Sequence, residues 1–442
     1  MLGDRSASFA IGLAGAAILL AATTAAKAGG FAIREQSAHG LGAAYAGVAA
    51  GGSLSSMFWN PATMTQMPGI QSESVISGIF PYSANSPTGG TLAALGGTGN
   101  IAHDALAPAG YFSWQVNPQI WIGASFNAPF GLTETFPDNW AGRDYGAGGS
   151  HLSSYNFTPS VAYRINDWIS VGAGVQIQYA NATMTTGYGA LLGSQTSISG
   201  AGWGFGFTAG VTLKPTQTTT IGIGYRSAID QDINGTLQVP AAVAAFSTPG
   251  SASTTIRLPD TVSVGLRQKL TPQLTALATV EWANWSRIGT SAVLQPGGAQ
   301  ATEFNGRTAA PVNIAFEYKD GWFFSLGAEY ELTDQFTLRG GVGYEKSPIT
   351  DQVRIPILED NDRTWLSVGG SYKVTNKLTL DFAYSHLFVK STPIDVVAGN
   401  PSFNGAVTYD GTVDSHIDIV SVGLKYRWDN PAPAPVERMY VK

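Results

Sequence analysis

The chain has 442 residues and is poor in charge, because charged side chains make up 12% of it against about 25% of an ordinary soluble domain. Its formal net charge is −6 and no cluster of Lys and Arg is present, which excludes nucleic acid as a partner. No internal apolar run reaches the roughly 18 residues of a membrane-spanning helix. If the chain lies in a bilayer, it must therefore do so as a closed β-barrel.

The chain begins with a segment typical of an export signal. Phe9 to Ala22 form a continuous apolar stretch, and Ala26-Lys27-Ala28 has the small-x-small pattern of a signal-peptidase site. A membrane anchor is the alternative, but fourteen apolar residues are fewer than the roughly 20 that a spanning helix needs. We expect residues 1–28 to be a signal peptide that is removed before Gly29.

The next segment, Gly29 to Met64, does not follow a strand pattern. It is rich in glycine and alanine, with small residues clustered from Gly40 to Gly47, and it lacks any sustained alternation of apolar and polar residues. Small residues of this kind suit a backbone that passes close to another one. We expect residues 29–68 to form a plug rather than part of a sheet.

From about residue 70 onward, apolar and small or polar residues alternate in long segments. In residues 169–179 the odd positions are apolar while the even ones are Ser, Gly or Gln, and residues 336–345 alternate in the same way. Such segments, about ten residues long, fit strands with lipid on one side and a polar lumen on the other. A soluble sandwich gives the same alternation, but the low charge and the aromatic residues near strand ends favour a membrane barrel: Trp121, Trp168, Trp322, Trp365 and Trp428.

Turn residues allow the strands to be counted. Six tight turns are predicted at Asn117-Pro118, Asn166-Asp167, Lys214-Pro215, Thr271-Pro272, Thr333-Asp334 and Thr375-Asn376. Longer loops are predicted near 131–152, 187–200, 236–253, 289–312, 347–361 and 391–413. Six hairpins with one strand before them and one after them make fourteen. We therefore predict an all-β fold, a transmembrane antiparallel β-barrel over residues 69–428, with its short turns in the periplasm and a disordered Pro-rich periplasmic tail at 429–442.

A fourteen-stranded barrel is too wide for side chains alone to fill, so a lumenal plug is expected. The plug segment resembles the N-terminal hatch of the FadL/TodX family of outer-membrane transporters. The similar elements are Gly30-Phe31, the Gly-Leu-Gly-x-Ala-Tyr-x-Gly run of Gly40 to Gly47, and Asn60-Pro61-Ala62. Further similar motifs follow in the family's order: Gly131 to Phe136, Ala162 to Asn166, Trp203 to Gly206, Tyr225 to Ser227, Leu258 to Asp260, Trp285-Ser286 and Ser347-Pro348.

The resemblance implies passive uptake of hydrophobic molecules across the outer membrane, with hatch gating and a lateral exit at a kink in the third strand. The hatch residues would be Asn60, Pro61 and Ala62. The kink would comprise Asn127, Ala128, Pro129, Phe130 and Gly131, since Pro129 cannot donate to a strand ladder. Ligand contacts are expected inside the lumen at Phe31 and Ile33, and in an outer groove at Leu191, Leu192, Val239, Val243 and Phe246, where ordinary loop packing is the alternative. Pro240 is expected to begin a short helix there.

The substrate class stays open between long-chain fatty acids and neutral aliphatic or aromatic hydrocarbons. Residues 183–186 read Thr-Met-Thr-Thr where the fatty acid carriers of the family are expected to place an Arg, although Arg34, Arg164 or Arg226 could supply the charge. The other expected partners are outer-membrane lipids, and the barrel is expected to be a monomer. Neither a cofactor nor a metal is expected.

Two other classes of protein are alternatives. An outer-membrane barrel hydrolase, either a phospholipase or a protease, would need a nucleophile beside His386, but the adjacent Ser385 points to the opposite face of a strand. A structural barrel or adhesin would need neither a kinked wall nor a plug. The hatch motifs therefore favour a transporter over an enzyme.

Overall fold

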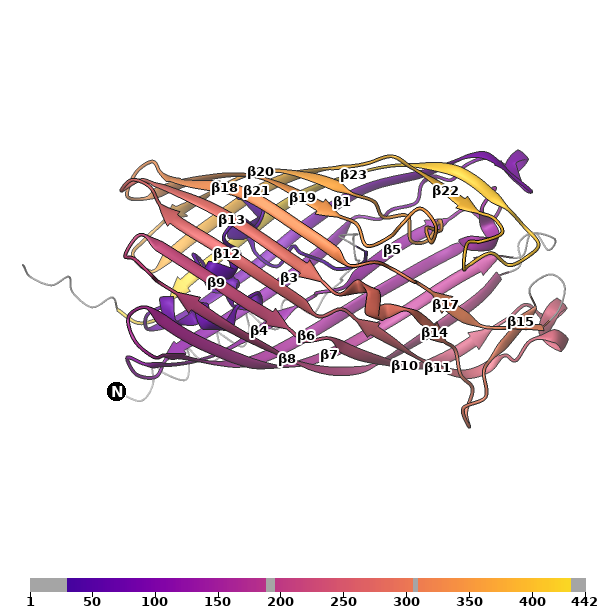
Figure 1. Cartoon of the computed structure of the whole chain (residues 1–442), viewed down its shortest axis with the longest axis horizontal. Coiled ribbons are helices and arrows are strands. Elements are labelled where there is room, and N and C mark those ends of the chain that lie inside the picture. The colour runs from indigo at the N-terminus through magenta and orange to yellow at the C-terminus, as the bar shows by residue number, and fades with distance from the viewer. Residues whose placement is uncertain (1–29, 188–194, 305–308, 431–442) are drawn as a thin grey trace, which may run out of the picture.

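The computed structural model describes residues 30–187, 195–304 and 309–430, and it is dominated by one closed antiparallel barrel (Figure 1). The first strand, β1 (Ile70–Gly90), pairs with the last, β23 (Tyr409–Arg427), from Gln71 opposite Arg427 to Gly90 opposite Tyr409. The barrel has fourteen strands when the interrupted strands β4–β5, β9–β10, β11–β12 and β21–β22 are each counted once. The predicted fold class is confirmed.

The remaining wall strands are β3 (Ala105–Gln115), β4 (Ile120–Asn127), β5 (Gly131–Phe136), β6 (Gly148–Arg164), β7 (Ile169–Gly187), β8 (Gln195–Leu213), β9 (Thr219–Arg226), β10 (Ile229–Gln238), β11 (Gly250–Leu258), β12 (Thr261–Lys269), β13 (Leu274–Ala283), β18 (Gly321–Glu331), β19 (Phe336–Lys346), β20 (Arg363–Lys373), β21 (Leu378–Val389) and β22 (Thr392–Val396). Short elements lie in the loops: η5 (Ala93–Leu95), β2 (Gly99–Asn100), η6 (Arg143–Tyr145), η7 (Ala241–Phe246), η8 (Trp285–Ile288), β14 (Thr290–Ala292), β15 (Thr302–Phe304), β16 (Ala309–Pro311) and β17 (Asn313–Ala315).

The six predicted tight turns are confirmed, and they join β3 to β4, β6 to β7, β8 to β9, β12 to β13, β18 to β19 and β20 to β21. All of them lie at the same end of the barrel, on the left in Figure 1. In five of the six turns a polar residue ends the first strand, and β8 ends at Leu213; in all six the chain reverses within a few residues. We call this the short-turn end and the opposite one the long-loop end.

The predicted long loops were too long in four places. Gly131 to Phe136 pairs with residues 148–153, and β22 pairs with residues 409–413. The strand β8 already starts at Gln195, β10 continues to Gln238, and β11 starts at Gly250. These stretches are rich in Gly, Ser and Thr, which resemble loop residues in sequence. They are strands because the backbone ladder of the barrel continues past the lipid-facing band, where alternation with apolar residues is no longer required.

The wall is apolar outside and polar inside, as the alternation predicts. Large outward side chains such as Phe205 and Leu326 are 66% and 64% exposed, whereas Gln176 and Gln178 on the inner face are buried. Two of the five aromatic residues near the strand ends, Trp121 and Trp365, point inward and are fully buried. Trp121 donates to the carbonyl oxygen of Met67, and Trp365 packs edge-on against Tyr45. These two rings therefore hold the plug rather than face lipid.

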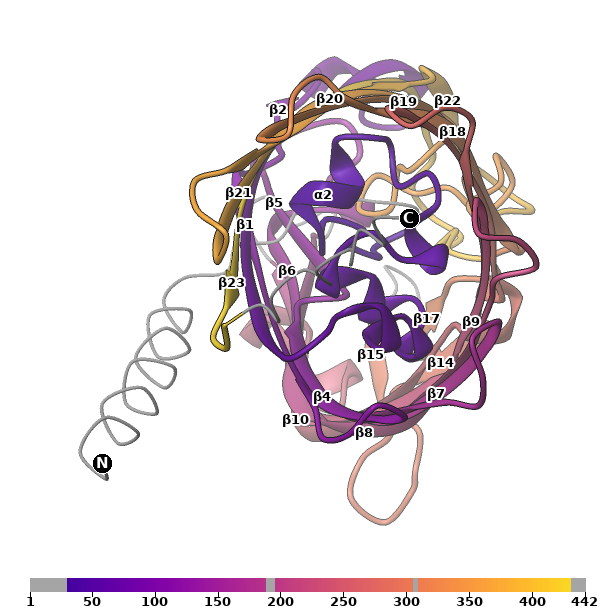
Figure 2. The same ribbon diagram turned by 90° about the vertical axis from the view of Figure 1, so that its left-hand side faces the viewer.

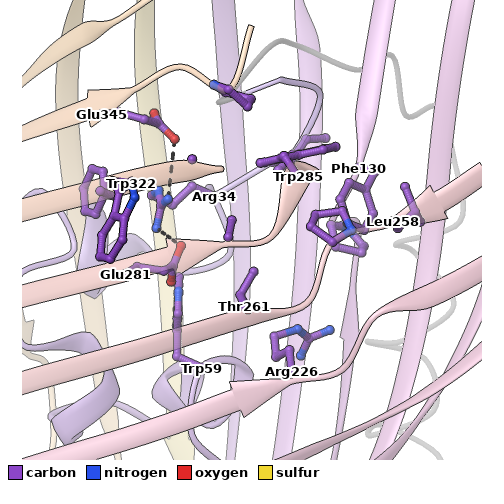
Figure 3. A pocket seen from close by; sticks show the side chains of 18 of the residues that line it. Arg34, Trp59, Phe130, Arg226, Leu258, Thr261, Glu281, Trp285, Trp322 and Glu345 are labelled. Atoms are coloured by element: carbon purple, nitrogen blue, oxygen red, sulfur yellow. Dashed lines mark hydrogen bonds and ion pairs between the residues drawn. The ribbon is translucent and has the colours of Figure 1, made fainter. Parts of the chain in front are cut away.

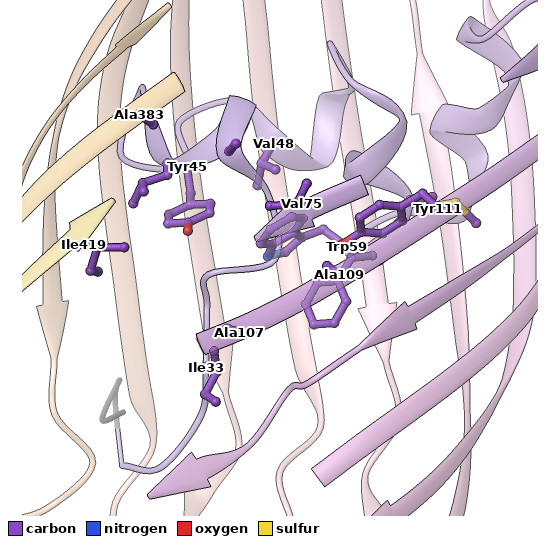
Figure 4. Packing of buried hydrophobic residues seen from close by; sticks show 14 of the residues in the cluster. Ile33, Tyr45, Val48, Trp59, Val75, Ala107, Ala109, Tyr111, Ala383 and Ile419 are labelled. Carbon is purple, nitrogen blue, oxygen red and sulfur yellow. The ribbon is translucent and has the colours of Figure 1, made fainter. Parts of the chain in front are cut away.

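The plug fills the short-turn half of the lumen (Figure 2). It contains α2 (Ala38–Leu41), η2 (Val48–Ala50), η3 (Leu54–Phe58) and η4 (Pro61–Gln66), and almost every residue from Phe31 to Thr65 is at least partly buried. Its apolar side chains pack against small inward residues of the wall, for example Tyr45 and Trp59 against the region of Ala107 and Ala109 (Figure 4). No helix among the described residues is long and apolar enough to cross a membrane.

Glycines on the inner face of the wall let the plug backbone approach closely. A Cβ atom at Gly222 would lie 1.8 Å from the carbonyl oxygen of Ala49, and one at Gly224 would lie 1.8 Å from that of Trp59. Any larger residue at either position would push the plug away from the wall. The glycine-rich strands therefore serve the packing of the plug.

Candidate functional site

The N-terminal segment, which we define as Gly30–Gln36, crosses the kink of the third barrel strand. Ala32 forms an isolated antiparallel bridge with Phe130. The Ile33 amide donates to the carbonyl oxygen of Pro129 at 2.8 Å, and the Gly131 amide donates to that of Phe31 at 2.9 Å. Between β4 and β5, one edge of the chain therefore pairs with the plug instead of with the neighbouring strand β3.

The kink leaves an interruption in the wall, which we call the first gap. The β3–β4 ladder ends at Gly110 opposite Phe126, and contact resumes only at the bridge between Ala102 and Glu134. Between these points residues 105–109 of β3 pair with β1 alone. The sequence predicted the failure at Pro129, and the structure interrupts the ladder with β6 over residues 128–130, with that ladder restored at Gly131.

Side chains close the first gap where the ladder is missing. The Gln36 amide donates to the carbonyl oxygens of Ile33 (3.1 Å) and Ala128 (2.9 Å). Asn127 donates to the Gln36 side chain at 3.1 Å and to the Tyr111 hydroxyl at 2.7 Å, and Tyr111 donates to the Gln36 carbonyl oxygen at 2.7 Å. These groups are buried, so each bond lost would leave a polar atom unsatisfied.

A cavity with an empty volume of about 880 Å³ lies behind the N-terminal segment (Figure 3). Ile33 and Arg34 line it on the plug side. Phe130, Trp285 and Trp322 contribute aromatic surface from the wall side. We call it the first cavity. Its largely apolar lining with a few charged groups is typical of a small-molecule site.

Arg34 is held by two carboxylates of the wall. Its guanidinium lies 2.8 Å from Glu281 and 3.5 Å from Glu345, and it stacks 3.9 Å from the centre of the Phe323 ring (Figure 3). The next residue, Glu35, is buried, and its Oε2 atom has no hydrogen-bond partner among the described residues. Burial raises the pKa of the Glu35 carboxyl to about 7.

Arg226 also lines the first cavity, but it is bound differently. It donates to the carbonyl oxygen of Phe58 at 3.0 Å and to the side chain of Gln176, and it lies 4.1 Å from the centre of the Phe58 ring. Within the described parts of the chain, no carboxylate lies at ion-pair distance from it. Arg164, the third candidate cation of the sequence, instead stacks on Trp121 and bonds to Thr65 at the short-turn end.

A second cavity of about 640 Å³ lies toward the long-loop end, and apolar residues such as Leu152, Met184 and Ile256 line it. Phe31 forms part of this lining, whereas Ile33 lines the first cavity, so the structure places both predicted lumenal residues at cavities. The Phe31 ring lies 4.9 Å from Trp285 and 6.1 Å from both Phe130 and Phe316. This aromatic cluster separates the two cavities.

The predicted hatch residues Asn60, Pro61 and Ala62 lie away from both cavities, against the wall. The Asn60 side chain accepts from the Ala62 amide and so caps η4, where Pro61 is the first residue. Its amide donates to the carbonyl oxygens of Ala49 (2.8 Å) and Val211 (3.0 Å). These contacts join the plug to itself and to β8.

The predicted outer groove is described only in part. Leu191 and Leu192 lie outside the described residues, and for Val243 and Phe246 only the backbone in η7 is described. Val239 packs against an apolar cluster that also contains Leu237, Ala252, Val293, Ala301 and Val312. Three of these come from the loop at 289–312, which the sequence interpretation did not connect with the groove. Pro240 precedes η7, as expected.

Sequence reasoning missed several residues of the first cavity, among them Trp285, Glu281 and Glu345. A signal existed for Glu281, because it occupies an inward position of β13, between the outward residues Val280 and Trp282. A charged residue at an inward position of a barrel strand is a reasonable candidate for a functional group. Trp285 carried no such signal, since only the fold brings η8 to Phe31.

His386 does not form part of a hydrolytic site. Its Nδ1 atom lies 2.8 Å from Asp418, and its ring packs 4.3 Å from Phe388 on the outer face of the barrel. Ser385 points into the lumen, where it accepts from Ser367 at 2.8 Å. The two residues therefore lie on opposite faces, as the strand geometry predicts.

A closed fourteen-stranded barrel, with an apolar outer face, a folded plug and apolar cavities inside, defines an outer-membrane channel. The chain belongs to the family described as Outer membrane protein transport protein (OMPP1/FadL/TodX), whose pattern it matches over residues 19–428. Members of this family are transport channels and not enzymes. The protein is therefore an outer-membrane transporter of hydrophobic compounds.

Curated relatives match over most of their length. Outer membrane protein P1 of Haemophilus influenzae is 28% identical over 93% of this chain and 98% of its own. A long-chain fatty acid transport protein of Salmonella typhi is 29% identical over 84% of this chain and 90% of its own. Among solved structures, a FadL homologue of Pseudomonas aeruginosa superposes with a TM-score of 0.81 at 23% identity, over 90% of this chain and all of that one.

Proposed function

We propose that the protein takes up hydrophobic molecules by passive diffusion through two cavities in sequence, and that the N-terminal segment is the gate. The observation that carries the proposal is the pairing of Phe31 and Ile33 with the kink at Pro129–Gly131, because one short segment both lines the cavities and covers the first gap. Asn60, Pro61 and Ala62 would act as the anchor against which this segment moves.

A molecule would first occupy the second cavity near the long-loop end and then pass the aromatic cluster around Phe31. The predicted outer groove around Val239 would lie before this step. The centres of these rings lie 4.9 to 6.1 Å apart. The rings separate easily, because the contact within an aromatic pair stabilises it by only about 0.5–1.5 kcal/mol beyond the burial of its surface. An apolar solute that enters the cluster replaces ring contacts with contacts of its own.

From the first cavity the molecule would leave sideways through the first gap into lipid. Each buried CH₂ group contributes about 0.8 kcal/mol relative to water, so an exit into the bilayer is downhill where an exit into the periplasm is not. Displacing the N-terminal segment breaks two backbone bonds, the contacts of Gln36, the bond from Gly30 to Asp360 and the ion pairs of Arg34. No energy source other than the concentration gradient is required.

The substrate that Arg226 favours is a long-chain monocarboxylate. Arg226 is a cation of the first cavity that no described carboxylate neutralises, whereas Arg34 is balanced by Glu281 and Glu345. A buried charged group with no opposite charge at ion-pair distance gains from a bound carboxylate. A neutral aromatic hydrocarbon is the second candidate, favoured by the aromatic cluster of Phe31, Phe130, Trp285 and Phe316.

Uptake of radiolabelled palmitate and of toluene by cells that lack other transporters of this kind separates the two candidates. We expect Arg226→Gln to reduce palmitate uptake strongly and Arg226→Lys to retain most of the palmitate uptake. Neither substitution should affect toluene uptake. Equal loss of both substrates in Arg226→Gln would contradict the carboxylate role. Failure of the unmodified protein to take up either substrate would contradict the proposed function itself.

A further inference from the structure

The barrel wall has another interruption, between β8 and the kinked strand β9–β10. β8 pairs with β9 only as far as Thr208 opposite Arg226, and with β10 only from Ala201 opposite Asn234. Residues 202–207 have no register partner on this side, although they remain paired with β7 on the other. We call this interruption the second gap.

One backbone bond, from the Ser227 amide to the carbonyl oxygen of Phe207 at 2.8 Å, crosses the edge of the second gap, and side chains bridge the rest of it in place of a ladder. Ser227 accepts from the Phe207 amide at 2.8 Å, and the Gln231 side chain donates to the carbonyl oxygen of Gly202 at 2.7 Å. Gln231 also accepts from Gln178 of β7 at 3.1 Å, across the inner face of β8. Side-chain bonds can be broken by rotation about χ angles, whereas a ladder bond breaks only when the backbone moves.

Three glycines of β8, Gly202, Gly204 and Gly206, make room for this arrangement. A Cβ atom at Gly202 would lie 1.6 Å from the carbonyl oxygen of Asp232, and one at Gly204 would lie 2.4 Å from Ile229. β10 therefore lies partly over the inner face of β8 rather than edge to edge with it. At this place the wall is held by overlap and by amide side chains.

The second gap separates the first cavity from lipid. Ser227 and Ile229, which border the gap, also line the first cavity beside Arg226. On the outer face of the same stretch, Trp203, Phe205 and Phe207 are 56%, 66% and 52% exposed. An apolar molecule in the cavity is thus one strand edge away from the bilayer.

We propose that the second gap is a second lateral portal between the first cavity and the membrane, an inference that rests on the proposed uptake function. The two gaps share one design: backbone pairing stops beside the cavity, and buried amide and hydroxyl side chains hold the edges together. At the first gap these are Gln36, Asn127 and Tyr111, and at the second they are Gln231, Gln178 and Ser227. Where side chains replace most of a backbone ladder, two strands are held together less firmly than elsewhere in the barrel wall. At both gaps this weaker part of the wall borders the cavity.

The test locks each gap with a disulfide, which is clean because the chain contains no cysteine. Ala32 and Phe130 face each other without mutual hydrogen bonds, and such antiparallel pairs have Cα atoms about 4.5 Å apart, within disulfide range. Ala32→Cys with Phe130→Cys therefore locks the first gap. Gly206→Cys with Ser227→Cys locks the second, since the Ser227 hydroxyl lies 2.6 Å from the position of a Cβ at Gly206.

Uptake of palmitate and of toluene is then measured with oxidised and with reduced cells. We expect the first lock alone to reduce uptake without abolishing it, and both locks together to reduce it to the level of cells without the protein, with recovery on reduction. Background uptake with the first lock alone would overturn the proposal. So would residual uptake that the second lock leaves unchanged. Uptake by the unmodified protein tests the proposed function separately.

A second variant covers the case in which the lock at Gly206 impairs folding, which the reduced cells would reveal. Gln231→Leu removes the donor to Gly202 and should raise uptake in the background of the first lock. The matched control is Gln119→Leu in a short turn, where the side chain is exposed. Equal uptake in the two variants would contradict a portal at the second gap.

Discussion

The two parts of the plug differ in how they are held. The hatch body, Ser37–Gln66, contacts the wall through capped turns, close backbone approaches and buried charges: Ser53 donates to Glu73 at 2.7 Å, and His39 lies 2.9 Å from Glu329. The N-terminal segment, Gly30–Gln36, is held by a short bridge to the kink, by the bond from the Gly30 amide to Asp360, and by Arg34.

The difference indicates which part can move. The body of the hatch sits on a network in which Glu329 and Asp381 bind Arg339 and Lys425, and burial together with these cations lowers the pKa of His39 to about 3. The N-terminal segment is held over fewer residues: to leave the wall it must break the bridge at the kink, the bond from Gly30 to Asp360, the bonds of Gln36 and the ion pairs of Arg34. The ion pairs are the costliest of these contacts, because removing one partner of a buried charge pair costs about 3–5 kcal/mol. The segment is nevertheless the smaller unit to displace, so it is the part suited to gating.

The largest expected effect comes from breaking the anchor. Asn60→Ala removes the cap of η4 and leaves the carbonyl oxygens of Ala49 and Val211 without their donor, so we expect the hatch body to lose about 3–5 kcal/mol of docking free energy. The barrel should still fold, and the lumen should conduct ions in planar bilayers. Asn376→Ala, in an exposed turn, is the control. Wild-type conductance in Asn60→Ala would show that the body is not anchored there.

A matched pair of glutamines sharpens the comparison. Gln36→Ala removes bonds to Ile33 and Ala128, which we expect to destabilise the closed segment by about 1–3 kcal/mol, so the Ile33 amide should exchange roughly 5 to 160 times faster. Gln66→Ala removes the bond to Ala50 in the hatch body and should leave exchange at the Ile33 amide unaffected. Hydrogen exchange followed by mass spectrometry measures both. Equal acceleration in the two variants would mean that the plug moves as one unit.

A pH dependence of the gate is expected as well. The pKa of Glu35, raised to about 7 by burial, means that protons stabilise the closed segment, while a displaced and solvated Glu35 would titrate near 4.5. The closed state is therefore most stable below about pH 4.5, loses stability as pH rises to about 7, and changes little above. Exchange at Ile33, corrected for intrinsic rates, should follow this course, and Glu35→Gln should abolish it. A pH-independent rate in the unmodified protein would contradict the assignment.

Local rules were sufficient to predict the barrel. Each short turn carries its own signal, such as Asn117-Pro118 or Lys214-Pro215, and strand alternation follows from lipid on one side. The strand ends were missed because pairing beyond the lipid band depends on the neighbouring strand. The inward orientation of Trp121 and Trp365 could not be predicted, because a position near a strand end does not decide which face an aromatic side chain takes.

The site was less predictable, since it depends on contacts between distant parts of the chain. Pro129 identified the kink, and Phe31 was expected in the lumen, where it lines a cavity. The bridge between Ala32 and Phe130 joins residues almost a hundred positions apart, and no local pattern specifies it. The same holds for Glu345 and Glu281, which meet Arg34 from two different strands.

The most direct test of a moving segment on a fixed body is hydrogen exchange with and without palmitate. The Ile33 and Gly131 amides close the bridge across the kink, whereas the Leu41 amide bonds to Ser37 within the hatch body. We expect palmitate to accelerate exchange at Ile33 and Gly131 and to leave Leu41 unchanged. Acceleration at all three amides, or at none of them, would contradict the account.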